Sequence, residues 1–218
     1  MHKLTRSLIL LLLSIGFVLV LGAFRFEGNK KSASCHVTQK ICFANSVCHK
    51  NPDGSVIEWQ SDFKLKQSDF KAARKENPGS AVATTVSAFG YHITDDDGKI
   101  CGHIYVRFYC NESWWNSNII RDDAITDVLE HEQLHFDICE LFGRKLYKEL
   151  LELRNSGRFN SHNIERLQSK LEKQYSNYQD KYDKDTEHSI NRVEQYYWSK
   201  RVKKELEAMS AYSNYHNF

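Results

Sequence analysis

The stretch Val128-Leu129-Glu130-His131-Glu132-Gln133-Leu134-His135-Phe136 contains the pattern His-Glu-x-x-His. Residues four apart lie on one face of an α-helix, so His131 and His135 can present two imidazoles to one metal ion. Glu132 lies one step round the helix, close enough to hold a water molecule bound to that metal. Zinc accepts imidazole ligands and keeps an open position in catalytic sites, where it lowers the pKa of water to about 7. The pattern therefore predicts a catalytic zinc site with Glu132 as general base.

The sequence around this pattern predicts a buried helix over residues 124–154. Apolar side chains recur nearly all round it, which is typical of a helix with neighbours on several sides. They are Ile125, Val128, Leu129, Leu134, Phe136, Ile138 and Phe142. Asp122 and Asp123 favour a helix start, Asn155-Ser156-Gly157 favours its end, and Gly143 is a point where it could break. Because so short a pattern also arises by chance, two ordinary helix histidines are the alternative.

A catalytic zinc site takes three protein ligands, so a third residue must come from another part of the chain. His188 is the preferred candidate, since it begins the last predicted helix and no ligand follows His135 at short range. The alternatives are carboxylates near His188, a cysteine one turn beyond His135 and two histidines of a predicted hairpin. They are Asp183, Asp185, Glu187, Cys139, His92 and His103. The sequence leaves open whether cobalt or manganese takes the place of zinc.

The N-terminus has the pattern of an export signal. Lys3 and Arg6 precede an uncharged run over residues 8–24. A basic start followed by an apolar run is typical of a signal peptide, and this run is also close to the short limit of a membrane span. We expect residues 1–24 to be a cleaved signal, with an uncleaved membrane tether through residues 8–24 as the alternative. Either one places the rest of the chain outside the cytoplasm, in the periplasm or the extracellular medium.

At 218 residues the chain is long enough for one sizeable core. We expect a cysteine-containing entry segment over residues 25–54, one domain over 55–209 and a loose tail over 210–218. The net charge is +2 and the Lys and Arg residues are scattered, which gives no case for a nucleic-acid partner. The sequence does not set the oligomeric state.

Six cysteines in an exported chain indicate disulfides. They are Cys35, Cys42, Cys48, Cys101, Cys110 and Cys139. If residues 101–110 form one straight strand, Cys101 and Cys110 lie about 30 Å apart on opposite faces and need other partners. Several free, buried cysteines are the alternative.

The residues before the motif predict strands, and those after it predict helices. The apolar residues between Ile100 and Phe108 alternate with polar ones, which indicates a half-buried strand. It pairs with 81–93 as a hairpin. Another strand is expected over 55–65, an aromatic connector over 111–118, and helices over 161–182 and 189–209. The expected fold class is α+β, zincin-like, with a small antiparallel sheet followed by the long His-Glu-x-x-His helix and two further C-terminal helices.

Several segments of the chain are similar to a known family. They are His131 to Ile138, Ser113-Trp114, Tyr182-Asp183, Thr186-Glu187-His188, Gln195, Trp198, Ile57-Glu58-Trp59, Phe63 and Ala83-Thr84-Thr85. Over roughly residues 55–205 they resemble the DUF922 family, exported bacterial proteins whose zinc-dependent protease activity is inferred. The resemblance implies a zincin-like fold, zinc ligands at His131, His135 and His188, and Glu132 as the base. Ser189 departs from the family pattern, in which Gly is expected.

These observations lead to the hypothesis of an exported zinc-dependent metallopeptidase with protein or peptide substrates. Glu132 takes a proton from the attacking water and passes it to the leaving amine, while zinc stabilises the developing oxyanion. The 100–109 strand is expected to be the edge along which a peptide adds, and Tyr182, His103 and Trp114 are candidate cleft residues. The alternatives are a non-catalytic exported zinc-containing binding protein and an amidase acting on cell-wall peptides.

Overall fold

The computed structural model of the chain describes residues 53–73, 82–96, 99–116 and 124–215. The expected signal segment over 1–24 and nearly all of the expected entry segment over 25–54 lie outside the described residues. So do Asp122 and Asp123, which were expected to start the long helix. Among the described residues, no helix combines the length and the apolar character needed to cross a bilayer.

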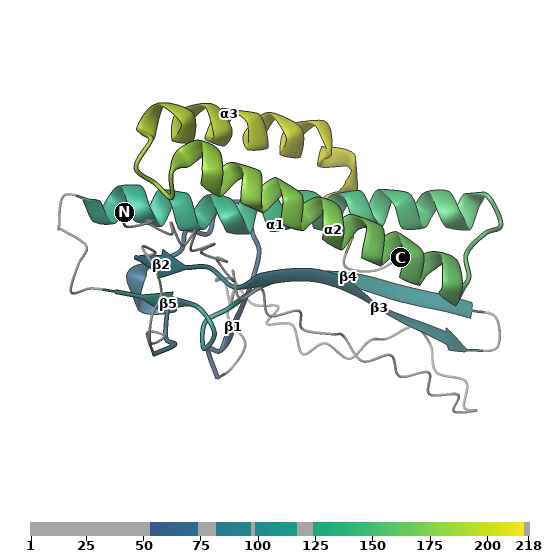
Figure 1. Cartoon of the computed structure of the whole chain (residues 1–218). Coiled ribbons are helices and arrows are strands. Elements are labelled where there is room, and N and C mark those ends of the chain that lie inside the picture. The colour runs from purple at the N-terminus through teal and green to yellow at the C-terminus, as the bar shows by residue number, and fades with distance from the viewer. Residues whose placement is uncertain (1–52, 74–81, 97–98, 117–123, 216–218) are drawn as a thin grey trace, which may run out of the picture.

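Strands precede helices along the chain, so the predicted α+β class is confirmed (Figure 1). The strands are β1 (Val56–Glu58), β2 (Ala83–Thr84), β3 (Ser87–Asp96), β4 (Lys99–Tyr109) and β5 (Trp114–Trp115). The helices are α1 (Ile125–Asn155), α2 (Ser161–Thr186) and α3 (Arg192–Ala208), with short 3-10 turns at Gln67–Asp69 and Ser210–Tyr212.

The predicted hairpin is the main part of a three-stranded antiparallel sheet with the order β1-β4-β3. His92 lies opposite His103 in its register. Ile104, Val106 and Phe108 are buried on one face, as their alternation predicts. Because β4 is the central strand, the expectation that 100–109 forms an open edge is wrong. β1 pairs with the end of β4 at residues 107–109, and the Ile104 amide donates to the Tyr215 carbonyl.

The segment expected as one strand over 81–93 is divided in two by its long-range partners. β2 pairs with β5, whereas β3 pairs with β4. At the junction the Val86 amide donates to the Ser113 hydroxyl and the Val86 carbonyl accepts from the Tyr109 amide. The first strand is likewise shorter than expected, and the aromatic connector over 111–118 contains β5.

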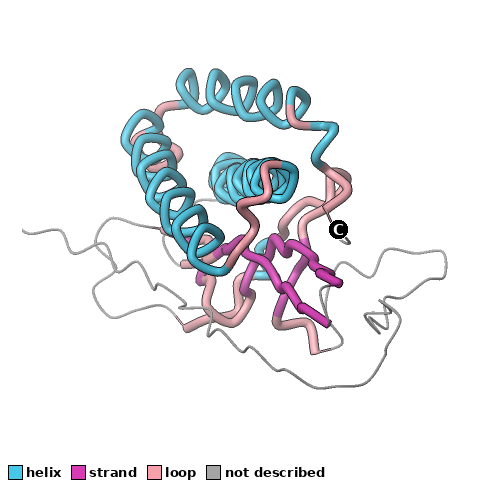
Figure 2. The backbone as a smooth tube through the Cα atoms, turned by 90° about the vertical axis from the view of Figure 1, so that its right-hand side faces the viewer, coloured by secondary structure: helices cyan, strands magenta, loops and turns pink. Residues whose placement is uncertain are grey.

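Helix α1 occupies the centre of the molecule, with the sheet on one side, α2 on another and α3 on a third (Figure 2). This position explains its apolar pattern, since residues on nearly every face are buried. It also means that polar residues of α1 lie inside the protein, where they need partners from neighbouring elements.

Gly143 does not interrupt α1, so the break considered at this residue is absent. The glycine instead allows α1 to approach the sheet, because a Cβ atom at this position would lie 2.4 Å from Cγ2 of Val106. Carbon atoms at van der Waals contact are about 3.5–4.0 Å apart.

The substitution Gly143→Ala is expected to lower the free energy of unfolding by about 1–2 kcal/mol, because overpacking outweighs the better helix propensity of alanine. Urea denaturation measures this effect. In a Val106→Ala background the cost of Gly143→Ala should shrink or reverse. An equal cost in both backgrounds would contradict close packing between these two residues.

Within the expected C-terminal tail, Tyr215 is packed against the core, whereas residues 210–214 are mostly exposed. The Tyr215 side chain is buried and its hydroxyl donates to Oε2 of Glu140 at 2.5 Å. Arg144 binds the other oxygen of Glu140 and also donates to the Leu206 carbonyl. These contacts fasten the C-terminal segment and the end of α3 to α1.

The cysteines divide into two kinds. Cys110 and Cys139 are buried thiols, which agrees with the alternative expectation that several cysteines are reduced and buried. Cys101 is disulfide-bonded. The remaining cysteines, Cys35, Cys42 and Cys48, lie outside the described residues.

Candidate metal centre

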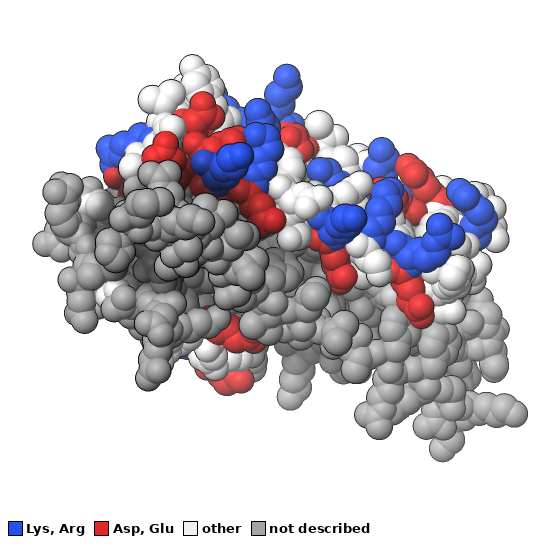
Figure 3. Space-filling model, in the orientation of Figure 1, with Lys and Arg blue, Asp and Glu red and all other residues white. Residues whose placement is uncertain are grey.

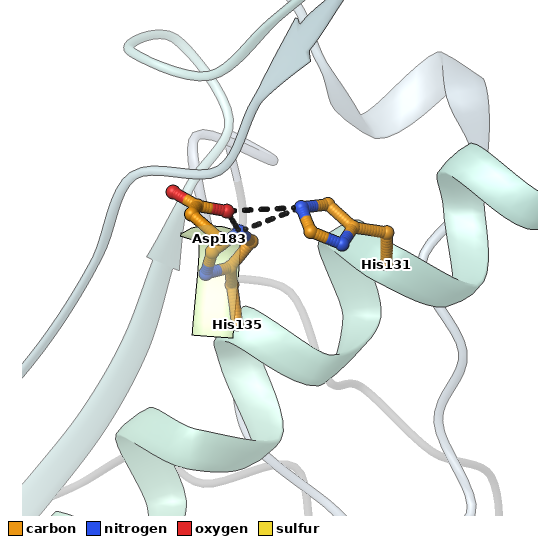
Figure 4. A group of neighbouring side chains, drawn as sticks. All are labelled: His131, His135 and Asp183. Atoms are coloured by element: carbon orange, nitrogen blue, oxygen red, sulfur yellow. Dashed lines mark hydrogen bonds and ion pairs between the residues drawn. The ribbon is translucent and has the colours of Figure 1, made fainter. Parts of the chain in front are cut away.

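Three side chains from two helices converge on one point (Figure 4). Nε2 of His131 and Nε2 of His135 are 3.1 Å apart, and they lie 3.1 and 3.0 Å from Oδ1 of Asp183. The histidines come from consecutive turns of α1, as the four-residue spacing predicts. Asp183 comes from the last turn of α2, which packs against α1.

The three atoms fit a metal ion. In a tetrahedral zinc site with bonds of 2.0–2.1 Å, neighbouring ligand atoms are about 3.3–3.4 Å apart. The distances of 3.0–3.1 Å between these atoms are close to that separation. Two imidazole nitrogens and one carboxylate oxygen are also a donor set found in catalytic zinc sites.

Gln179 fixes the tautomer of His135. Its Nε2 donates to the His135 carbonyl at 3.0 Å, and a carbonyl can only accept. The amide oxygen of Gln179 therefore faces Nδ1 of His135 at 2.6 Å, so Nδ1 carries a proton. Nε2 is then the nitrogen that faces Asp183 and His131; it donates a proton to Asp183 in the metal-free chain and is the atom that a metal ion would bind. A second hydrogen bond that orients a ligating imidazole in this way is typical of metal sites.

Gln195 of α3 has the same role at His131. Its Oε1 lies 3.2 Å from Nδ1 of His131 and accepts from the Tyr182 hydroxyl at 2.7 Å. The Tyr182 ring stacks on the His131 imidazole with a centroid separation of 4.6 Å. Tyr182 is completely buried, so it packs against the histidines inside the protein and does not line a cleft.

The substitution Gln179→Leu is expected to weaken zinc binding by about 10–100-fold, because it removes the acceptor that orients His135. A competition titration with a chromogenic chelator measures the dissociation constant. Gln174→Leu, at an exposed position of the same helix, is the matched control and should have no effect. Unchanged zinc affinity in Gln179→Leu would show that this hydrogen bond does not support the site.

Glu132 is buried beside the histidines, with 4% of its surface exposed. The Thr85 hydroxyl donates to its backbone carbonyl at 3.2 Å, which ties this turn of α1 to the end of β2. Oε2 of Glu132 has no hydrogen-bond partner among the described residues. Burying a carboxylate oxygen without a donor is unfavourable, so this atom calls for a donor such as a water molecule in the site.

The charges of the site favour a bound cation. Burial alone raises the pKa of Asp183, but His135 and hydrogen bonds from His131, His135 and His188 hold it well below its usual range. Burial lowers the pKa of His135, but Asp183, Glu132 and Gln179 raise it to about 9. In the metal-free chain the proton on His135 stabilises the Asp183 carboxylate. A metal ion would compete with this proton for the position between the two side chains.

Residues 112–189 match a family model. The model is that of DUF922, described as a bacterial protein of unknown function. The DUF922 match covers β5, α1 and α2, and thus Glu132, Gln179 and the three converging residues, but it ends before Gln195. It is narrower than the resemblance drawn from the sequence over 55–205. Neither the curated proteins nor the solved structures contain a match to this chain.

His188 lies at the edge of the DUF922 match and at the edge of the site. It was expected to begin the last helix, but α2 continues to Thr186 and α3 starts at Arg192. His188 sits between them in a left-handed conformation with φ of 52°, as do Glu187 and Ser189 at 49° and 78°. Its side chain is 61% exposed, and Nδ1 is 3.5 Å from Oδ1 of Asp183. It therefore contacts the site but does not belong to the three-residue group.

The other candidate ligands lie elsewhere. Asp185 binds Lys181 and the Trp198 indole, and Glu187 is exposed. Cys139 is buried near Ser87 and Tyr175, and burial raises its pKa to about 12. His92 and His103 face each other on the hairpin, with ring centroids 5.5 Å apart. Trp114, a candidate cleft residue, is buried in β5.

Asp183 was one of the alternative ligands expected from the sequence, whereas the supporting roles of Gln179 and Gln195 were not expected. A signal for Gln179 exists, since it precedes Asp183 by one helical turn on the same face. Gln195 was noticed only as part of the family pattern. Its contact with His131 joins residues 64 positions apart, which no local spacing reveals.

Proposed function

We propose that the chain is an exported zinc-dependent metallopeptidase of zincin-like architecture. His131, His135 and Asp183 would hold the zinc ion. The single observation that carries the proposal is the buried Glu132 side chain beside this group, whose Oε2 has no hydrogen-bond partner among the described residues. When bound, zinc supplies a Lewis acid that lowers the pKa of water and polarises a carbonyl. A site with three protein ligands keeps a position open for these events, whereas a structural zinc is closed by four.

Glu132 would act as the general base and then as the acid. It accepts a proton from the attacking water and passes that proton to the nitrogen of the leaving amine. Its position suits this role, because Glu132 is buried directly beside His131 on the helix and its Oε2 has no hydrogen-bond partner among the described residues. Gln179, Gln195 and Tyr182 keep the imidazoles in place throughout, and His188 is positioned at the exposed rim.

β2 replaces β4 as the edge that could align a peptide substrate. The Asn116 amide donates to the Val82 carbonyl, so alternate residues of this strand face β5. In an antiparallel ladder the backbone groups of the intervening residues, Ala83 and Thr85, point away from β5. On the side of β2 that faces away from β5, these groups have no backbone partner among the described residues. Thr85 also donates to the Glu132 carbonyl, so this edge lies next to Glu132. An extended peptide could add to it as a further strand.

The proposal is tested in two steps on the full chain. Metal content is measured by mass spectrometry after purification without added metal, and near one zinc per chain is expected. Hydrolysis is then measured with a broad peptide library that includes cell-wall peptides. Cleavage that stops on chelation and returns with zinc supports a peptidase. Cleavage restricted to cell-wall peptides would favour an amidase, and zinc without any cleavage would favour a binding protein.

A further inference from the structure

The large hydrophobic side chains that are exposed among the described residues lie together around the start of α3. Ile190, Val193, Tyr196 and Tyr197 are 76, 65, 54 and 59% exposed. Val193, Tyr196 and Tyr197 are spaced by three and four residues, so they share one face of the helix, and Ile190 immediately precedes it. A grouped apolar surface of this kind marks an interaction site more often than scattered single residues do.

The same face of α3 is basic beyond the aromatic residues. Lys200, Lys203 and Lys204 are exposed, and the Lys200 ammonium lies 4.5 Å from the Tyr196 ring centroid. Arg192 is paired with Asp127 of α1. Glu207 is the single acidic residue of α3 that is exposed. Figure 3 shows uncharged surface, Lys and Arg, and interspersed Asp and Glu along the upper edge, where α3 lies.

We propose that this face of α3 docks on the surface of an anionic lipid bilayer. Tyrosine is enriched at the level of lipid headgroups, because its ring is apolar and its hydroxyl is polar. Lysines next to such residues are attracted by anionic headgroups. The uncharged run over residues 8–24, expected to be an export signal or tether, would bring the chain to a membrane independently of α3.

Charge argues against a second copy of the chain as the occupant. In a two-fold symmetric dimer both copies would contribute the same lysines, so the interface would gather positive charge from each. Like charges gathered in one interface are unfavourable, whereas anionic headgroups neutralise them. The docking face begins two residues after His188, so docking would hold the converging residues His131, His135 and Asp183 near the bilayer.

Site-directed photocrosslinking of the full chain tests this proposal. The substitution Tyr197→p-benzoylphenylalanine places the crosslinker on the docking face, and Gln174→p-benzoylphenylalanine places it on the exposed surface of α2 as a matched control. Vesicles contain phosphatidylglycerol and phosphatidylcholine with a labelled acyl chain. We expect lipid label at position 197 and little at position 174. Lys200→Gln, Lys203→Gln and Lys204→Gln together should reduce the label at 197 by about tenfold or more.

Four results would overturn the proposal. Equal label at positions 174 and 197 would mean that the N-terminal segment, and not α3, brings the chain to the lipid. Label at neither position would mean that α3 faces away from the bilayer. A crosslink from position 197 to a second copy of the chain would identify the face as a dimer interface. Equal label in vesicles of phosphatidylcholine alone would overturn the requirement for anionic lipid.

Discussion

The substitution Glu132→Gln is expected to reduce peptide hydrolysis by about 10²–10⁴-fold while zinc content stays unchanged. Glutamine preserves the size of the side chain but cannot accept the proton from water. The carboxylate makes no hydrogen bond to a described residue through Oε2, so the fold should tolerate the amide. The kcat and KM for a cleaved peptide and the zinc content of the same preparation are the measurements.

Glu130→Gln is the matched control for this experiment. Glu130 precedes the motif on the same helix and is exposed, so its removal changes the charge of α1 equally without touching the site. Its activity should remain at the wild-type level. If both variants lost activity together, the effect would belong to the charge of the helix. If Glu132→Gln kept full activity, Glu132 would not be the general base.

Asp183→Ala and His188→Ala are expected to differ sharply in zinc affinity. Removing Asp183 deletes one of the three converging atoms, so the loss should exceed the approximately 10–100-fold effect of an outer hydrogen-bonding partner. Removing His188 should change affinity only a few-fold, roughly as for an exposed charge near a site. The dissociation constants can be measured by chelator competition. Thermal unfolding with and without zinc gives an independent readout, because a ligand that binds the folded state raises its stability.

Asp180→Ala provides the control for a lost carboxylate, since Asp180 is exposed on α2 three residues before Asp183. It should bind zinc like the wild type. The opposite ranking, with affinity retained in Asp183→Ala and lost in His188→Ala, would return the third ligand to His188. The left-handed segment would then have to move on metal binding to bring His188 inward.

The sequence predicts those parts of the fold that depend on local periodicity. α1 follows from apolar residues recurring round a helix, and its end follows from Asn155-Ser156-Gly157. The hairpin of β3 and β4 follows from alternation with a period of two. The pairing of His131 with His135 on one face needs only the helical repeat, so two of the three converging residues are determined by spacing alone.

The third converging residue could not be settled in this way. Asp183 and His188 are both within reach in the sequence, and the choice depends on where α2 stops. α2 continues one turn further than expected, which keeps Asp183 on the face that packs against α1. The left-handed backbone at residues 187–189 then carries His188 outward. Such a conformation is rare for residues other than glycine, so the local sequence gives little warning of it.

The sequence by itself determined the motif helix, the pairing of two strands as a hairpin and two histidine positions, because these depend on periodicities of the chain. The tertiary structure alone decided the central place of β4, the division of β2 from β3, the presence of Asp183 beside the histidines and the support from Gln179 and Gln195. Those features arise where segments distant in sequence satisfy one another's backbone groups and buried polar side chains, and only packing brings such partners together.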